Sequence, residues 1–346
     1  MNIPDIISSE EQLDTFLAEP YPETVKMMRN LKGDIMILGV AGKMGPSLAR
    51  LARNATNEAG IDRSIFGVSR FSNSGVQDQL ESWGVETIQC DLANYGELAA
   101  LPDAENVIFM AGKKFGSVGS EPETWLLNTL VPGYVAKRFQ KSRIVVFSTG
   151  CVYDLVSRET GGSKESDPPG PIGEYANSCL GRERIFEYLS GQSNTPGLLF
   201  RLNYAIDLRY GVLLDIAQSV YENREIDITV DDVNIIWQGD ANNRALLSLA
   251  HTSVPPAVLN VTGPEIISVT KVAREFGRIF NKDVRLSGTP INRSYLSNAS
   301  QSIRLFGEPR ISVDRMVHWT AEWIRCGGYV YGKPTMFQIT DGNYLQ

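Results

Sequence analysis

The stretch DIMILGVAGKMG, residues 34–45, contains the pattern that decides the fold. A short apolar run ends at Gly39, and Gly42 and Gly45 follow, with a helix expected to begin at the last of these glycines. Glycines at this G-x-x-G-x-x-G spacing let the backbone turn sharply and let a pyrophosphate approach it closely. The helix N-terminus then offers free N–H groups and a partial positive charge. Strand, glycine loop and helix together predict a dinucleotide-binding unit.

Strand-like and helix-like segments alternate after this stretch. Near-continuous apolar runs are typical of a parallel sheet that helices cover on both faces. We expect an α/β, Rossmann-type doubly wound parallel sheet with a smaller C-terminal substrate-binding lobe. The expected strands lie at 34–40, 64–70, 85–91, 106–112, 143–150 and 197–203, and helices are expected at 10–17, 23–30, 174–190 and 269–280, among others.

Three parts of the chain can be distinguished by this pattern. Residues 1–33 form an N-terminal helical extension, and residues 34–205 form the NAD(P)-binding Rossmann domain. Residues 206–346 form mainly a substrate-binding lobe, in which a segment at about 233–262 returns to the Rossmann sheet. We expect the ligand in the cleft between the lobe and the sheet, because parallel sheets bind ligands beyond the carboxyl ends of their strands.

Composition excludes several classes of protein. A net charge of −7 argues against non-specific nucleic-acid binding, which needs a basic face. No apolar run approaches the roughly 18–20 residues that span a bilayer, and the first residues lack a signal-peptide pattern. Four scattered cysteines and two histidines argue against a disulfide framework, a metal site or a Ser-His-Asp triad. We expect a cytoplasmic protein without a nucleic-acid or membrane partner.

Residues that follow the later strands complete the expected cofactor site. Ser69 and Arg70 stand where an acidic residue would select NAD(H), and they can instead bind the 2′-phosphate of NADP(H). NADP(H) is therefore favoured, and NAD(H) stays open. The expected cofactor-binding residues are Gly39, Gly42, Lys43, Met44, Gly45, Ser69, Arg70, Asp91, Leu92, Ala111, Gly112, Lys113, Asn128 and Asn203.

This order of motifs resembles the extended short-chain dehydrogenase/reductases, the NAD-dependent epimerase/dehydratase family. The resemblance covers about residues 34–327 and includes MAG at 110–112, STGCVY at 148–153 and FRLNYA at 200–205. It implies a catalytic set of Ser or Thr, Tyr and Lys. The tyrosine acts as acid or base on the reacting oxygen, and the lysine holds the nicotinamide ribose and lowers the tyrosine pKa.

Carried onto this chain, the resemblance places Thr149 at the hydroxyl position and Tyr175 at the tyrosine position, but Cys179 stands where the lysine is expected. A free tyrosine has a pKa near 10, so Tyr175 without a cation should be a poor general base that can still act as an acid or donor.

Three hypotheses follow from the missing lysine. In the first, a cation from elsewhere replaces it, with Arg182 or Lys113 as candidates. In the second, the chemistry is an elimination or isomerisation in which the tyrosine need not ionise, assisted by Thr149 and an acid such as Glu174. In the third, the protein is a non-catalytic sensor of a dinucleotide, or a lyase or isomerase that keeps the nucleotide only as structure.

The family's substrates are mostly sugars, often joined to a nucleotide diphosphate. Aromatic and amide side chains suit a sugar ring, so the expected substrate residues are Cys151, Tyr204, Arg209, Trp237 and Gln238. No second cationic cluster is evident in the sequence, so a free or acidic sugar fits as well as a nucleotide sugar. The resemblance therefore implies NAD(P)-dependent epimerisation, dehydration or carbonyl reduction of a sugar by a homodimer.

Overall fold

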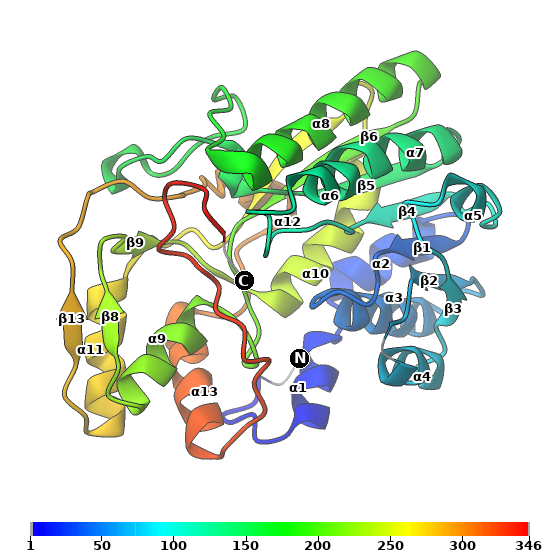
Figure 1. Cartoon of the computed structure of the whole chain (residues 1–346). Helices are drawn as coiled ribbons and strands as arrows, with labels where there is room; N and C mark the ends of the chain where they lie inside the picture. Colours follow the sequence, from blue (N-terminus) through cyan, green and yellow to red (C-terminus); the bar gives the residue numbers. More distant parts are fainter. Residues whose placement is uncertain (1–2, 73, 345–346) are drawn as a thin grey trace.

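The computed structural model describes residues 3–72 and 74–344, so the outer limits of the expected domains, at residues 1–2 and 345–346, lie outside the described residues. A seven-stranded parallel sheet forms its centre, in the order β11-β6-β5-β4-β1-β2-β3 (Figure 1). The strands of this sheet are β1 (Ile35–Leu38), β2 (Ile65–Ser69), β3 (Glu86–Gln89), β4 (Asn106–Phe109), β5 (Arg143–Thr149), β6 (Gly197–Leu202) and β11 (Ala257–Val261). This sheet confirms the expected Rossmann-type fold, and its seventh strand, β11, lies within the segment at about 233–262 that we expected to return to the Rossmann sheet.

The first strand shows why this sequence forms a central strand. All four residues of β1 are buried, and consecutive side chains enter opposite cores: Ile35 and Ile37 on one face, Met36 and Leu38 on the other. Leu38 is paired with Val68 of β2 and with Phe109 of β4. The loops that follow these three strands therefore leave the sheet at one edge, where the strand order reverses and ligands bind in such folds.

Helices cover both faces of the sheet (Figure 1). One layer contains α2 (Pro22–Asn30), α3 (Gly45–Ala59), α4 (Ser74–Ser82) and α10 (Gln238–Leu247). The other contains α5 (Tyr95–Ala99), α6 (Glu121–Trp125), α7 (Val131–Arg138) and α8 (Gly173–Ser193). Short helical turns η2 (Gly150–Val152), η3 (Arg158–Thr160) and η4 (Ser248–His251) lie in the connections.

Between Glu121 and Arg138 the structure has three consecutive helical segments. Between α6 and α7 lies a π-helical turn, η1 (Leu126–Leu130), in which the Val131 N–H bonds to the Leu126 carbonyl. Pro132, within the first two residues of α7, has no N–H to donate to the Asn128 carbonyl four residues earlier, and Arg182 donates to that carbonyl instead. The irregularity thus lies before the proline, and it contains the buried Asn128.

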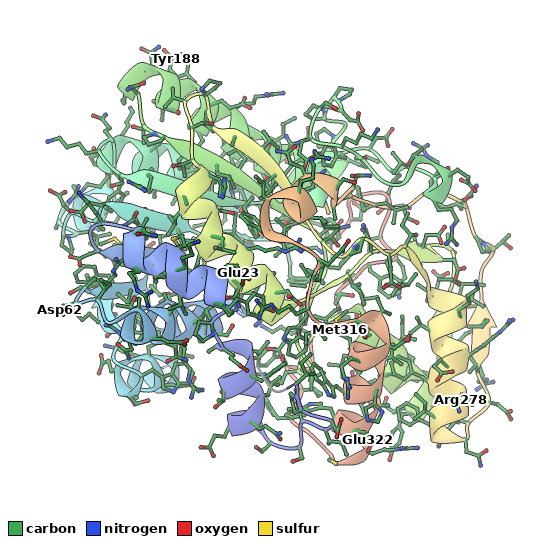
Figure 2. All side chains as sticks on the ribbon, turned by 180° about the vertical axis from the view of Figure 1, so that it is seen from behind. Glu23, Asp62, Tyr188, Arg278, Met316 and Glu322 are labelled. Atoms are coloured by element: carbon green, nitrogen blue, oxygen red, sulfur yellow. The ribbon has the colours of Figure 1, made fainter. Side chains whose placement is uncertain are left out.

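The smaller lobe is built from helices and two-stranded ladders around its own apolar core. Trp237, Phe276 and Trp319 are buried in that core, and Met316 of α13 joins them while Arg278 and Glu322 lie on the outside (Figure 2). The elements of this lobe are α9 (Val212–Tyr221), α11 (Val269–Phe280), α13 (Val313–Arg325), β7 (Ala205–Ile206), β8 (Glu225–Asp227), β9 (Asp232–Val233), β10 (Ile236–Trp237), β12 (Ile267–Ser268) and β13 (Arg285–Ser287). The short helix α12 (Ser300–Phe306) packs instead against β11 of the main sheet.

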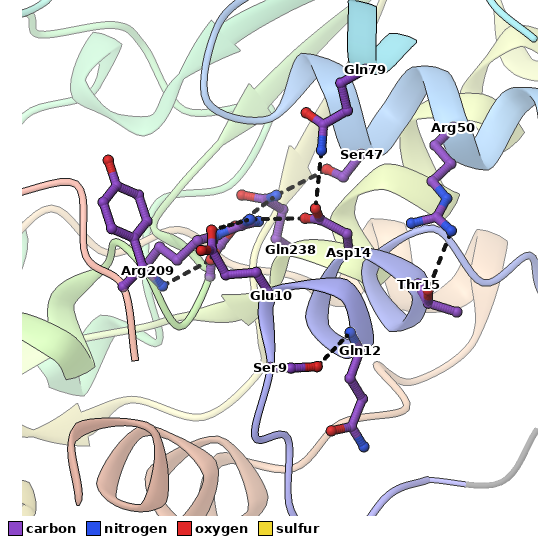
Figure 3. Close-up of polar contacts among 12 residues, drawn as sticks. Ser9, Glu10, Gln12, Asp14, Thr15, Ser47, Arg50, Gln79, Arg209 and Gln238 are labelled. Atoms are coloured by element: carbon purple, nitrogen blue, oxygen red, sulfur yellow. Dashed lines mark hydrogen bonds and ion pairs between the residues drawn. The ribbon is translucent and has the colours of Figure 1, made fainter. Parts of the chain in front are cut away.

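The first helix, α1 (Glu10–Leu17), connects the two parts of the molecule. Ser9 caps its N-terminus by accepting a hydrogen bond from Gln12 N, at 3.2 Å. Toward the Rossmann part, Thr15 accepts a bond from Arg50 of α3 at 3.2 Å (Figure 3). Toward the lobe, the ring of Phe16 packs edge-on against Trp319, with centroids 5.3 Å apart. The N-terminal extension therefore braces the Rossmann part against the lobe.

Candidate active site

A cavity of about 360 Å³ opens at the carboxyl edge of the sheet. It lies where the loops after β1, β2, β3 and β4 meet, as the parallel register requires. Its lining includes eight of the residues that the sequence assigned to the cofactor: Gly39, Gly42, Ser69, Arg70, Asp91, Leu92, Ala111 and Gly112.

The glycine loop fits the pyrophosphate of a dinucleotide. Gly39 has φ +88°, and a Cβ there would lie 2.7 Å from the Ala111 nitrogen. A Cβ on Gly45 would lie 2.0 Å from the Val40 carbonyl oxygen, so only glycine lets α3 begin this close to β1. A Cβ on Gly42 would approach the Gly39 carbonyl at 3.4 Å and, among the described residues, nothing nearer. The loop thus keeps bare backbone at the cavity in front of a helix N-terminus.

Asn128 holds the loop after β4 in place instead of lining the cavity. Its Oδ1 accepts a bond from the Lys113 backbone N–H, and its Nδ2 donates to the Lys113 carbonyl, both at 2.8 Å. The Lys113 side chain turns to Glu123, with Nζ 2.5 Å from the carboxylate, and also donates to Ser120. Lys113 is therefore engaged away from the expected catalytic residues.

Two other expected cofactor residues also lie outside the lining of this cavity. Asn203 is buried and donates to Asn234 Oδ1 and to the Tyr295 carbonyl, both at 3.0 Å. Met44 is the N-cap residue of α3 and packs against the apolar core. The structure gives both side chains contacts within the protein.

The expected catalytic pair comes together between β5 and α8. Thr149 ends β5, and Tyr175 lies in the first turn of α8. The Thr149 hydroxyl accepts a bond from Cys151 N at 3.2 Å and donates toward the Tyr175 phenol. Burial, with the neighbouring Cys179 and Cys151 thiols, raises the Tyr175 pKa well above its usual value of about 10. Tyr175 is therefore a neutral phenol at physiological pH.

Cys179 contributes no charge to this pair. The residue is buried beside Tyr175, and burial raises the pKa of its thiol to about 11. A protonated thiol neither replaces the positive charge of a lysine nor acts as a nucleophile.

Arg182, one of the two expected substitutes for the lysine, is fixed as part of the scaffold. Its guanidinium donates to the Phe147 carbonyl at 2.5 Å and to the Asn128 carbonyl and Oδ1 at 3.2 and 3.1 Å. Its charge lowers the Tyr175 pKa, but this effect ranks behind the burial that raises it. Glu174, the acid in the second hypothesis, is exposed and accepts a bond from Trp125.

A buried charged network lies beneath the pair. Glu183 of α8 is fully buried and accepts two bonds from Arg201 of β6, at 2.9 and 2.6 Å, and one from Ser148 Oγ at 2.5 Å. Arg201 also donates to the Tyr153 hydroxyl at 2.6 Å. This network fixes β5 immediately before Thr149, and it includes no residue that the sequence had assigned to the site.

Residues 328–344, which we call the strap, follow α13 and run between the lobe and the Rossmann part (Figure 1). Tyr344 is buried, with its ring edge-on to that of Tyr175 at 5.5 Å between centroids. Its hydroxyl lies 3.7 Å from the Cys151 sulfur, and Tyr204 is a further neighbour. Two expected substrate residues, Cys151 and Tyr204, thus lie near a tyrosine of this same chain.

Three lysines that are distant in the sequence, Lys43, Lys114 and Lys333, lie near one another, on two loops and on the strap. The Lys43 ammonium lies 3.2 Å from the centre of the Tyr210 ring and 4.7 Å from that of Phe115. Burial, then the charges of Lys333 and Lys114, lower the pKa of Lys43 to about 8. The second cationic cluster that the sequence did not reveal is therefore present. Its only signal was the Lys-Lys pair at 113–114 after the fourth strand.

Three expected substrate residues are not brought to Tyr175. Arg209 is buried in ion pairs with Asp207 and Asp14, both at 2.8 Å (Figure 3). Trp237 packs in the lobe core against Phe16 and Trp319. Gln238 donates to Ser47 of α3 at 3.0 Å (Figure 3). These residues join the lobe to α1 and α3, which sequence spacing alone did not indicate.

Neither a membrane span nor a metal centre emerges from the residues that the structure describes. Within residues 3–72 and 74–344, no helix has both the length and the apolar character that crossing a membrane requires. The same residues contain no group of three or more His, Cys, Asp or Glu side chains placed to hold a metal ion.

The sheet order, the glycine loop and the cavity at the strand ends define a Rossmann-fold dinucleotide-binding protein. Residues 35–206, about half of the chain, match the NAD dependent epimerase/dehydratase family, and the chain belongs to this family of NAD-dependent enzymes. No curated protein matches the chain.

Several solved structures share the fold. MoeE5 in complex with UDP-glucose and NAD is 19% identical with a TM-score of 0.68, and the match covers 85% of this chain and 99% of that one. UDP-glucose 4-epimerase from Thermotoga maritima, with UDP-glucose, is 16% identical with a TM-score of 0.70, covering 84% and 98%. UDP-glucuronic acid 4-epimerase from Bacillus cereus, in complex with NAD, is 16% identical with a TM-score of 0.68, again covering 84% and 98%. At these identities the likeness is one of fold.

Proposed function

We propose that this protein uses a nicotinamide dinucleotide to modify a sugar or sugar derivative, by epimerisation, dehydration or carbonyl reduction. The observation that carries the proposal is the position of the Thr149–Tyr175 pair at the carboxyl end of β5. The strand beside β5 is β4, and the loop after β4 lines the cavity together with the glycine loop. The sugar nucleotides named with the fold neighbours support a carbohydrate substrate.

The chain's own residues divide the chemistry between them. When bound, the dinucleotide supplies hydride transfer. Tyr175, a neutral phenol, is placed to donate its hydroxyl proton to the reacting oxygen, and Thr149 hydrogen-bonds the Tyr175 phenol and holds its position. Tyr344 and the strap cover this pair and exclude water from it.

We propose NADP(H) as the preferred cofactor. Ser69 and Arg70 line the cavity, and Arg70 is exposed, so its guanidinium is accessible to a 2′-phosphate bound there. NAD(H) is the alternative, because the fold neighbours MoeE5 and UDP-glucuronic acid 4-epimerase are in complex with NAD.

The lysine cluster supports an anionic sugar derivative as substrate. The charges of Lys114 and Lys333 both act on Lys43, so the three side chains lie close to one another. Like charges that lie close together repel one another, and a bound anion would offset this repulsion. A carboxylate or a phosphate on the sugar would supply that anion.

A non-catalytic dinucleotide sensor is the second candidate function. The position of Tyr344 favours it, because this ring packs on Tyr175 where a catalytic tyrosine would meet its substrate. The neutral Cys179 in place of a lysine favours it as well.

We further propose that the protein is a cytoplasmic homodimer that pairs through the helical face of α6, η1 and α8. Large apolar side chains are exposed there: Trp125 is 40%, Leu130 45% and Tyr188 67% exposed (Figure 2 labels Tyr188). Light scattering checks the mass, and Tyr188→Glu is expected to yield the monomer because it buries a charge in the interface.

The Tyr175→Phe variant tests the enzyme against the sensor. Wild type and variant are incubated with NAD⁺ or NADP⁺ and with UDP-glucose or UDP-glucuronic acid, and products are identified by chromatography. We expect turnover in the wild type and a loss of at least about 100-fold in the variant, the contribution of a positioned acid. Tyr188→Phe is the matched control on the same helix. Turnover that survives in Tyr175→Phe contradicts the proposed role of Tyr175, whereas nucleotide binding without turnover in both proteins favours the sensor.

A further inference from the structure

The cationic side chains near Tyr175 differ in whether other groups of the protein already bind them. Arg182 donates to three backbone and side-chain oxygens, and Lys113 is paired with Glu123. Cys179 carries no charge at physiological pH. The two substitutes expected from the sequence are thus both committed to other partners.

Lys114, the next residue along the loop after β4, points in the opposite way to Lys113. Its ammonium lies 5.9 Å from the centre of the Tyr175 ring and 4.7 Å from that of Tyr344. The charge also interacts with Cys179 and Cys151, so the amine lies near the side chain that replaced the lysine. Among the described residues its one hydrogen bond runs to the Thr335 carbonyl, at 3.3 Å, which leaves two of its three protons for a ligand.

Two anchors fix Lys114 in this place. On one side, Asn128 binds both backbone groups of Lys113 and sets the direction of the loop. On the other, Asp215 accepts bonds from the backbone and hydroxyl of Thr335, at 2.8 and 2.5 Å, and so holds the strap carbonyl that receives the Lys114 proton. The ammonium is therefore presented to Tyr175 by a loop and by the strap, and not by α8.

We propose that Lys114 is the positioning residue that performs the task of the missing lysine: its ammonium stabilises the Tyr175 phenolate and binds the ribose of the dinucleotide. This inference rests on the proposed function. The proton that Tyr175 gives to the reacting oxygen leaves a phenolate beside the ammonium, and Lys114 transfers no proton in this step. Burial lowers the pKa of Lys114, and the negative charge of the neighbouring phenolate counteracts that lowering. An opposite charge at about 4–6 Å lowers a pKa by about 1–3 units, so the phenolate becomes about ten to a thousand times more accessible.

Moving the lysine tests the inference. Lys114→Met removes the charge, Lys113→Met is the matched control on the same loop, and Lys114→Arg keeps the charge. Lys114→Met combined with Cys179→Lys returns an ammonium to the vacated position on α8. Affinity for NAD⁺ and NADP⁺ is measured by calorimetry for each protein, together with the thermal transition and the pH profile of turnover on UDP-glucose and UDP-glucuronic acid.

We expect Lys114→Met to weaken dinucleotide binding about tenfold and to move the Tyr175-dependent limb of the pH profile up by about one unit or more. Lys113→Met and Lys114→Arg should bind like the wild type, and the added Cys179→Lys should restore most of the lost affinity. If Lys114→Met shows no thermal transition, the measurement is repeated with Lys114→Gln, which keeps a donor for the Thr335 carbonyl but has no charge.

Dinucleotide affinity that is equal in Lys114→Met and Lys113→Met overturns the inference, and so does a loss that Cys179→Lys leaves unrepaired. A failure of the proposed function looks different. In that case no variant turns over either sugar nucleotide, while the pattern of dinucleotide affinities still decides the role of Lys114.

Discussion

Glu183 carries a buried charge beneath the candidate active site, and replacing it by alanine is expected to destabilise the fold strongly. Its carboxylate is fully buried and receives two bonds from Arg201 and one from Ser148. Without it, Arg201 would stay buried with the Tyr153 hydroxyl at 2.6 Å as its main partner. Breaking a buried ion pair by removing one partner costs about 3–5 kcal/mol. That is a large share of the roughly 5–15 kcal/mol by which domains are stable.

Urea unfolding, followed by circular dichroism, measures this loss. Glu187→Ala is the control on the same helix: Glu187 pairs with Arg184 at the surface, and such pairs contribute about 0–1 kcal/mol. The double variant Glu183→Met, Arg201→Met removes both charges, and we expect it to recover most of the loss because the desolvation cost disappears with them.

A loss below about 1 kcal/mol in Glu183→Ala would refute the reasoning, because a buried unpaired guanidinium cannot be that inexpensive. A double variant no more stable than Glu183→Ala would also refute it, since packing and not charge would then explain the effect. Because Ser148 precedes Thr149, dinucleotide-dependent turnover is expected to fall in Glu183→Ala even where the protein stays folded.

Three further predictions concern the cleft. Tyr344→Ala is expected to speed the alkylation of Cys151 by iodoacetamide, because the Tyr344 hydroxyl lies 3.7 Å from the Cys151 sulfur. Mass spectrometry measures the rate, and the control is Tyr329→Ala, at an exposed tyrosine. Equal rates in the two variants would show that Tyr344 does not cover the thiol. Affinity for UDP-glucuronic acid, measured by calorimetry, should fall as the pH rises through about 8, because the Lys43 ammonium is charged below that pKa and neutral above it. Lys43→Met should remove this dependence, and a wild-type affinity that is flat from pH 7 to pH 9 would count against it. Arg70→Glu should weaken NADP⁺ binding at least about tenfold relative to NAD⁺, the contribution of a charge-assisted hydrogen bond, and an unchanged ratio would assign Arg70 to solvent.

Local sequence patterns determined the sheet, the glycine loop and most helices. Helices α1 and α11 begin and end where the sequence predicted, since Ser9 and Ser268 cap them and their apolar residues recur at helical spacing. The cofactor cavity was also predictable, because parallel strands bring the residues that follow them to one edge. For these features a residue and its neighbours along the chain contain the necessary information.

Only the tertiary structure decided which charges meet at Tyr175. Lys113 and Lys114 are adjacent and chemically identical, and the bonds from Asn128 to the Lys113 backbone determine that Lys114 is the one turned toward the tyrosine. The strap lies outside the family pattern, yet it places Tyr344 on Tyr175 across 169 residues of chain, by contacts that leave no periodic signal in the sequence. Arg209 likewise was expected to face the substrate, but its guanidinium forms an ion pair with Asp14 of α1 instead. A side chain's direction depends on partners distant in the sequence, and for that reason spacing could locate the site without assigning all its residues.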